Sequence, residues 1–457
     1  MTVDQPSSAG DPGRRFDLVL RAARAAVDGG DRPATVAVSG GRVVHVGGPD
    51  ERWRGVAELT LGQDEILLPG LVDTHVHVNE PGRTHWEGFA SATRAALRGG
   101  VTTIIDMPLN SLPPTVDVPA LEVKRTAADG QCFVDVGFWG GAVPENTADL
   151  APLHKAGVFG FKCFLADSGV AEFPPLTPDR LTCVMSELAD LDALILVHAE
   201  DAEELAGATT ARGPRYADFL ASRPRRAENA AVSTVVNAAR ATGCRSHILH
   251  LSSADALPLL RAARSEGLRL TAETCPHYLA LAAEGIPDGQ TAFKCCPPIR
   301  EDANRQQLWE GLEDGTVDCV VSDHSPCVAE LKHLDTGDFG TAWGGVSSLQ
   351  VAFPVVWTEA ARRGHTITEV ATWMAERPAA LAGLSRKGAI AAGRDADFAV
   401  VAPDEWFTVD TDALEHKNPI SPYAGRELRG VVRSTWLRGQ RVTTDAPRGR
   451  LLWRGQS

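Results

Sequence analysis

The stretch "DTHVHVNEPG" (residues 73–82) places two histidines one residue apart at the end of an apolar run. Alternate residues of a β-strand point to the same face, so His75 and His77 are predicted to project together. Similar polar residues close three later apolar runs, namely His198, His250 and Asp323. Imidazole nitrogens and carboxylate oxygens are the donors that zinc and similar divalent ions prefer. The pattern therefore predicts a metal site, provided that the ends of these runs meet.

A lone histidine at the end of a strand is more often a core or capping residue than a metal ligand. Four imidazoles and one carboxylate that recur at strand ends favour the metal site over coincidence. Lys162 lies near the end of another run, where an ammonium would be repelled by metal ions. Either Lys162 is a salt-bridged or snorkelling side chain, for which Asp167 is a candidate partner, or its desolvated amine is neutral and has reacted with carbon dioxide. The resulting carbamate would be an anion able to bridge two metals.

Eight apolar runs alternate with stretches of helical period through the middle of the chain, as repeated βαβ units require. The runs are "ILLPGLVDTHVHV", "VTTIIDMP", "CFVDVGFWGG", "FGFKCFL", "LILVHAE", "SHILHLS", "LRLTAETCPHYL" and "DCVVSDHSP". They predict an α/β fold, a (β/α)8 TIM barrel over residues 66–384, with its chemistry at the C-terminal ends of the strands. That position matches the polar residues described above.

The two ends of the chain have a different rhythm, because strand-like segments with glycine turns occupy residues 16–65 and 385–457. "FDLVLRAARAAV" and "ATVAVSGGRVVHVG" lie in the first, and "DADFAVVAP", "ELRGVVRSTWLRGQRV" and "LLWRG" in the second. We expect them to meet in one small β domain. Residues 1–15 lack an apolar core and are predicted to be disordered rather than a signal peptide.

The composition and net charge of the chain argue against two classes of partner. The chain has 457 residues and a net charge of -14, which argues against nucleic acid as a ligand. No run reaches the roughly 18 apolar residues that a membrane span needs, so no membrane partner is expected. Nine scattered cysteines, several of them within apolar runs, are typical of reduced thiols and predict a cytoplasmic protein.

Five motifs in order, "DTHVHVNEPG", "FKCFLADSG", "LVHAE", "HILHLSS" and "VSDHSPC", resemble those of the cyclic amidohydrolases, and the resemblance covers residues 16–442. It implies a barrel joined to a small β-sandwich built from both termini, and homotetramers are common in the family. It further implies two divalent metal ions, most often zinc, and carboxylation of Lys162 (N6-carboxylysine) by carbon dioxide. The ligands implied are His75, His77, Lys162, His198, His250 and Asp323.

Local sequence separates the branches of this family. Dihydroorotases carry an arginine where this chain has Asn79, and an amide cannot replace a bidentate guanidinium. Hydantoinases carry a tyrosine where this chain has Asp167. The segments "NEPGRTHWEG", "DMPLNSLPPT", "FKCCPPIR", "TAWGGVSSLQ" and "HKNPISPYAG" resemble allantoinases instead. That branch opens the hydantoin ring of allantoin to allantoate in purine and ureide breakdown.

The resemblance makes Asp323 the expected general base, passing a proton to the departing ring nitrogen. The candidate substrate contacts are Asn79, Asn110, Cys296 and Ser322, the last two through backbone groups. Arg83 and Glu87 are interpreted as a solvated local pair. The alternatives are a hydantoinase (dihydropyrimidinase) or dihydroorotase, a mononuclear deaminase, and a non-catalytic scaffold. The scaffold predicts no metal.

Overall fold

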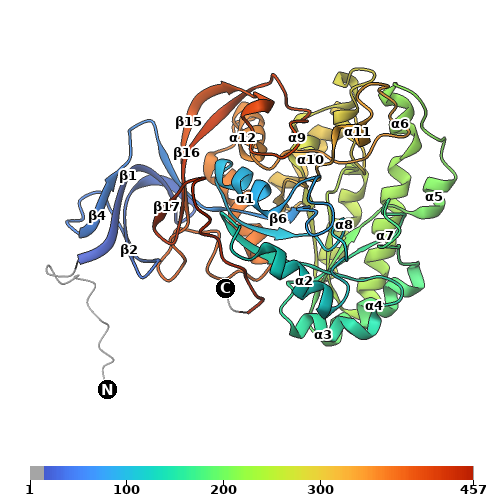
Figure 1. Ribbon diagram of the computed structural model, residues 1–457, viewed down its shortest axis with the longest axis horizontal. Helices are drawn as coiled ribbons and strands as arrows, with labels where there is room; N and C mark the ends of the chain where they lie inside the picture. The colour runs from blue at the N-terminus through green and yellow to red at the C-terminus, as the bar shows by residue number, and fades with distance from the viewer. Residues whose placement is uncertain (1–14, 456–457) are drawn as a thin grey trace.

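The computed structural model describes residues 15–455 and divides into a barrel and a β-sheet domain (Figure 1). The segment predicted to be disordered lies outside the described residues except for Arg15, which begins strand β1. In Figure 1 the first strands of the chain and its last strands lie on the same side of the barrel, although they are far apart in sequence.

Parallel strands form the barrel, and their C-terminal ends meet at one rim. They are β6 (Leu71–Val76), β7 (Val101–Asp106), β8 (Asp135–Phe138) with its short continuation β9 (Gly140–Gly141), β10 (Phe161–Phe164), β11 (Leu194–His198), β12 (Arg245–Ile248), β13 (Leu270–Thr274) and β14 (Cys319–Val320). Pairing runs from β6 to β8 and from β9 to β14, and a parallel bridge between Val76 and His324 closes the ring. The predicted (β/α)8 barrel is confirmed.

Helices cover the outside of the barrel and extend its loops. They are α1 (Phe89–Arg98), α2 (Val118–Ala128), α3 (Leu150–Lys155), α4 (Pro178–Asp190), α5 (Ala202–Ala206), α6 (Tyr216–Ser222), α7 (Arg225–Thr242), α8 (Leu257–Ser265), α9 (Pro276–Ala280), α10 (Asp302–Glu313), α11 (Ala329–Lys332), α12 (Ala352–Arg362), α13 (Ile367–Ala371) and α14 (Arg377–Leu381). Their ends follow from sequence: the Thr177 hydroxyl caps α4, Pro178 occupies its first turn, and Gly243 ends α7 at φ 70°.

The termini together form the β-sandwich domain. Its strands are β1 (Arg15–Val27), β2 (Gly30–Ser39), β3 (Arg42–Gly47), β4 (Arg54–Thr60), β5 (Ile66–Pro69), β15 (Phe398–Thr408), β16 (Glu427–Leu437) and β17 (Gln440–Val442). They pair in the order β17-β16-β15-β5-β1-β2-β3, with β4 beside β1. Bulges in the β1–β2, β2–β3 and β15–β16 pairs bend this sheet around its own apolar core.

The first apolar run was predicted as one barrel strand but contains two strands. β5 pairs with β15 in the sandwich, and β6 begins the barrel after Gly70. A side chain at Gly70 would overlap Thr102, so only glycine allows the chain to cross this closely from one sheet to the other.

The expectation that "LLWRG" adds a strand to the sandwich is wrong. Leu451 bridges Val136 of the barrel strand β8, and Val136 exchanges hydrogen bonds with Arg450 and Leu452. Strand β8 has backbone N–H and C=O groups along this stretch that no barrel strand pairs with, and the C-terminal segment forms hydrogen bonds with them.

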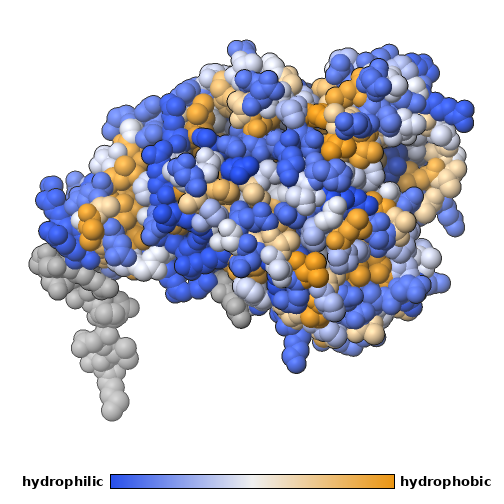
Figure 2. Space-filling model, viewed as in Figure 1, coloured by the Kyte–Doolittle hydropathy of each residue, from blue (hydrophilic) through white to orange (hydrophobic). Residues whose placement is uncertain are grey.

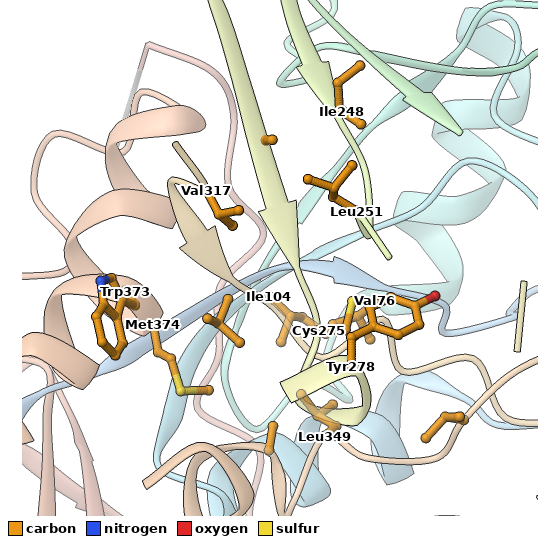
Figure 3. Packing of buried hydrophobic residues seen from close by; sticks show 14 of the residues in the cluster. Val76, Ile104, Ile248, Leu251, Cys275, Tyr278, Val317, Leu349, Trp373 and Met374 are labelled. Atoms are coloured by element: carbon orange, nitrogen blue, oxygen red, sulfur yellow. The ribbon is translucent and has the colours of Figure 1, made fainter. Parts of the chain in front are cut away.

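Apolar side chains from the strands and helices form the largest core (Figure 3). Cys275 and Tyr278 lie in it together, at the C-terminal end of β13. Over residues 15–455, no helix combines the length and apolar character that crossing a membrane requires. The face in Figure 2 is largely hydrophilic with small apolar areas.

Candidate metal centre

The six candidate ligands converge at the C-terminal rim of the barrel. They are His75, His77, Lys162, His198, His250 and Asp323, each at most 6% exposed. Asp323 Oδ1 lies 3.1 Å from His75 Nε2 and 3.7 Å from His77 Nε2. The Lys162 Nζ atom is 3.5 Å from His75 Nε2. Side chains from β6, β10 and the end of β14 thus face one point.

The other two imidazoles complete the ring of donors. The ring centroids of His198 and His250 are 4.5 Å apart, and those of His75 and His250 are 5.4 Å apart. His198 Nε2 lies 2.8 Å from Glu200, whose carboxylate is also gripped by Arg223. This hydrogen bond orients the His198 ring and leaves the lone pair of its Nδ1 free to bind a metal ion. Among residues 15–455, His250 Nδ1 has no hydrogen-bond partner, so this donor is also free.

Burial suits these groups to holding a metal. It lowers the pKa of His198, and it lowers the pKa of His75, His77 and His250 well below the usual value, so all four rings are neutral with lone pairs to donate. Burial also lowers the pKa of Lys162 to about 8, which makes a neutral amine accessible near neutral pH. The donor set therefore fits divalent ions.

The buried carboxyl of Asp323 also fits a site for a cation. Burial raises the pKa of its carboxyl to about 8, although Lys162 opposes the shift. A dication beside Asp323 would favour its charged form.

The salt bridge considered for Lys162 does not form. In the part of the chain that the structure describes, Lys162 has no ion pair with Asp167, and Asp167 Oδ1 accepts a hydrogen bond from the Gly169 backbone N–H at 2.9 Å. Phe164 lies 4.9 Å from the Lys162 amine and helps to exclude water. The Lys162 amine is therefore desolvated, and its burial also excludes a side chain that reaches solvent.

The backbone is strained at four candidate residues. Asn79 and Asn110 have φ 66°, and His250 and Asp323 have φ 35° and 43°. This left-handed region costs energy for residues other than glycine, and such residues cluster where side-chain direction matters for function. At His250 and Asp323 this backbone conformation turns the chain out of the strand at the candidate ligand itself.

A buried carboxylate that the sequence analysis missed supports the centre from below. Glu273 of β13 is completely buried, with Oε1 2.5 Å from His75 Nδ1 and Oε2 3.0 Å from His247 Nε2. Because an ionised carboxylate only accepts, both imidazoles donate to it. His75 is thereby held with its Nε2 lone pair facing the centre. The available signal was a charged residue inside the apolar run "LRLTAETCPHYL".

A cavity of about 670 Å³ opens above the centre. Its wall includes the ligands His77, Lys162, His198, His250 and Asp323, together with Asn110, Asp167, Cys296 and Trp343. This volume lies within the usual range for small-molecule sites, about 300–1,000 Å³. Two of the four predicted substrate contacts, Asn110 and Cys296, therefore reach the cavity.

The structure does not bring Asn79 or Ser322 to this wall. The Asn79 amide donates to Pro326 O at 3.2 Å, because its left-handed backbone turns the side chain toward the next loop. The Ser322 N–H donates to Asp73 at 3.0 Å, and its carbonyl accepts from the Ser348 hydroxyl. Asn79 and Ser322 therefore hold the loops at the barrel rim in place, on the side away from the cavity.

The interpretation of Arg83 and Glu87 as a solvated pair is wrong. Arg83 pairs with Glu172 at 2.5 Å, whereas Glu87 is fully buried and lies 3.2 Å from His324 Nε2. His324 follows Asp323 directly, so Glu87 anchors the segment that carries a proposed ligand.

The comparisons agree with this geometry. A sequence profile of the amidohydrolase family matches residues 66–442. An allantoinase from Streptomyces avermitilis is 58% identical over 96% of this chain and 99% of its own length, and one from Saccharomyces cerevisiae is 47% identical over 83% of both. Among solved structures, an L-hydantoinase (dihydropyrimidinase) from Arthrobacter aurescens matches with TM-score 0.89 and 28% identity, covering 96% of this chain and all of that one. The chain belongs to the amidohydrolase family.

Proposed function

We propose that this member of the amidohydrolase family is an allantoinase, which hydrolyses a ring amide of allantoin to give allantoate. The observation that carries the proposal is the convergence of four neutral imidazoles, a buried amine and a carboxylate under one cavity. The choice of allantoin rests on the 58% identity to the Streptomyces avermitilis allantoinase along nearly the whole chain. Hydantoinases are less similar in sequence, with 28% identity for the Arthrobacter aurescens structure.

We propose that two zinc ions are held by His75, His77, Lys162, His198, His250 and Asp323, with Lys162 carboxylated. When bound, the metals would lower the pKa of a water molecule and polarise the scissile carbonyl. The carbamate is supported by the burial of Lys162 and by its lack of an ion pair with Asp167. Two dications need more negative charge than Asp323 alone provides, and the carbamate would add it.

Asp323 would move the proton. Its carboxylate lies on the cavity wall, so it can accept a proton from the attacking water while the new C–O bond forms. The same oxygen would then deliver this proton to the ring nitrogen as the C–N bond breaks. The ring nitrogen leaves as the neutral NH2 group of a ureide within the same molecule, Asp323 is ionised again, and the new carboxylic acid loses its proton to solvent to give allantoate.

Asn110 and Cys296 would contact the substrate. The Asn110 amide offers one donor group and one acceptor to a ureide, and its Nδ2 is 3.5 Å from His77 Nδ1. We expect Cys296 to contribute its backbone. Asn79 and Ser322 would act indirectly by fixing the rim, and the neutral side chain at position 79 offers no clamp for a carboxylate.

The assembly and the compartment are also proposals. The family resemblance supports a homotetramer, which light scattering of the purified protein would test. All nine cysteines are free thiols, which supports a reducing compartment such as the cytoplasm.

A substrate panel tests the proposed reaction. Purified, metal-loaded protein would be assayed with allantoin, hydantoin, dihydrouracil and dihydroorotate under identical conditions. We expect kcat/KM for allantoin to exceed each of the others by at least about 100-fold, because a site built around one polar tail loses binding when that tail is missing. Faster turnover of hydantoin or dihydrouracil would assign the chain to the hydantoinases instead.

A further inference from the structure

A second group of metal-binding side chains adjoins the proposed centre. Cys275, His277 and Asp323 each offer a donor atom, and the three atoms lie within 4.8 Å of one another. Cys275 follows β13 at its C-terminal end (Figure 3), and His277 lies two residues later, in the first turn of α9. Asp323 is the only one of the three that borders the cavity.

His277 is the observation that points to a ligand. It is completely buried, and neither of its ring nitrogens has a hydrogen-bond partner among residues 15–455. Burying an unpaired polar group is costly, so buried imidazoles normally have a partner or bind an ion. Here one ring nitrogen already faces a thiol and a carboxylate.

A neighbouring cluster provides the contrast. His247, Glu273 and Cys319 also lie within 4.8 Å of one another. However, His247 Nδ1 pairs with the Thr271 hydroxyl at 2.7 Å and its Nε2 with Glu273 at 3.0 Å. Both ring nitrogens are satisfied there, so this cluster has no free imidazole donor.

We propose that Cys275, His277 and Asp323 form a third cation site. It adjoins the two-metal centre, and Asp323 belongs to both. A thiol, an imidazole and a carboxylate select a thiophilic divalent ion such as zinc, cobalt or cadmium over magnesium. Ligand atoms around tetrahedral zinc are about 3.5 Å apart, so the three donors would close by about 1 Å. On binding, Cys275 releases its proton to solvent and binds as the thiolate.

The site gives excess metal a way to inhibit the enzyme. A cation on Asp323 would occupy the carboxylate that must accept a proton, so turnover would fall by about 100-fold when the third site is full. This consequence rests on the proposed function, whereas the binding itself does not. Metal content and activity therefore test the two separately.

The experiment titrates zinc into protein that has been loaded with two equivalents and desalted. Bound zinc is measured by equilibrium dialysis and elemental analysis, and allantoin turnover is measured in the same samples. The parent should take up a third zinc as its activity falls. Cys275→Ser and His277→Asn should keep two zinc ions and full activity at low zinc, and should need about 10- to 100-fold more zinc for inhibition.

Cys319→Ser is the matched control, because it removes a buried thiol from the neighbouring cluster and should still bind the third zinc. Cobalt in place of the third zinc gives a readout independent of catalysis, because a thiolate–cobalt charge-transfer band should appear in the parent and be absent from Cys275→Ser. A parent that binds only two zinc ions, or a third zinc lost in Cys319→Ser but kept in Cys275→Ser and His277→Asn, would overturn the proposal. Third-site binding in a protein that does not hydrolyse allantoin would refute the proposed function alone.

Discussion

Replacing Glu273 with glutamine tests how the barrel prepares a metal ligand. Glu273 accepts hydrogen bonds from His75 Nδ1 at 2.5 Å and from His247 Nε2 at 3.0 Å, and all three residues are completely buried. Glutamine has one acceptor oxygen and one donor amide, so it can serve only one of the two donating rings. The other ring must change tautomer or lose its bond.

The structure indicates which ring gives way. His247 is held from its other side by the Thr271 hydroxyl at 2.7 Å, whereas His75 Nε2 faces the Asp323 carboxylate at 3.1 Å, which can accept a proton from that nitrogen. If His75 moves its proton to Nε2, that nitrogen no longer has a lone pair for a metal. Loss of such a supporting carboxylate weakens metal binding about 10- to 100-fold, which is about 1.4–2.7 kcal/mol.

The assay measures zinc affinity of Glu273→Gln by competition with a chelator, with kcat measured in parallel at two bound zinc ions per chain. We expect weaker zinc binding together with largely recovered kcat once the two ions are restored, at zinc concentrations below those that fill the third site. Glu359→Gln is the control, because it alters a glutamate in α12 that is 7% exposed and remote from the centre. Parental zinc affinity in Glu273→Gln would refute the argument about the tautomer.

Three further outcomes follow from the same contacts. Asp323→Asn should lower kcat by about 10²- to 10⁴-fold with a smaller change in KM, because the proton acceptor is removed together with one proposed metal ligand; steady-state kinetics on protein verified to hold two zinc ions would check this, and a change confined to KM would contradict it. Asn110→Ala should raise KM for allantoin about three- to tenfold through one lost hydrogen bond, and an unchanged KM would remove Asn110 from the substrate site. Lys387→Met should lower the free energy of unfolding at neutral pH by about 3–5 kcal/mol, because the Lys387 amine, 1% exposed, lies 2.6 Å from both Asp135 and Asp397. Burial raises the pKa of Asp135, but the neighbouring Lys387 amine outweighs this effect and lowers the pKa below its usual value. The ion pair therefore stabilises the fold above the usual aspartate pKa of about 3.9. This stabilisation is lost as pH falls through the lower folded value. Urea unfolding should therefore show a smaller difference between variant and parent in acid than at pH 7, and a difference independent of pH would contradict this.

Much of the fold was predictable because strands of a parallel barrel are short, apolar and regularly spaced. The candidate ligands were found for the same reason: a polar residue that ends a buried run stands out, and alternation placed His75 and His77 on one face. The predicted link between the chain termini also holds. The tail at Leu451 was misplaced because a strand pattern does not reveal which sheet edge it will meet.

Features that depend on loop conformation were beyond the sequence. Asn79 follows the two histidines directly, yet its left-handed backbone points the amide at Pro326 rather than into the cavity. Glu87 lies in a polar segment but is buried against His324 because the loop folds inward. Glu273 was missed because its partners, His75 and His247, come from distant strands.

The central claim is that metal ions held at the barrel rim with a carboxylated Lys162 carry out the hydrolysis. The most direct test is the allantoinase activity of one preparation measured against its metal content during chelation and reloading. The account predicts that activity disappears with the metal and returns as two zinc ions per chain are restored, with bicarbonate speeding the recovery. Metal-free protein that opens allantoin at the full rate would contradict it.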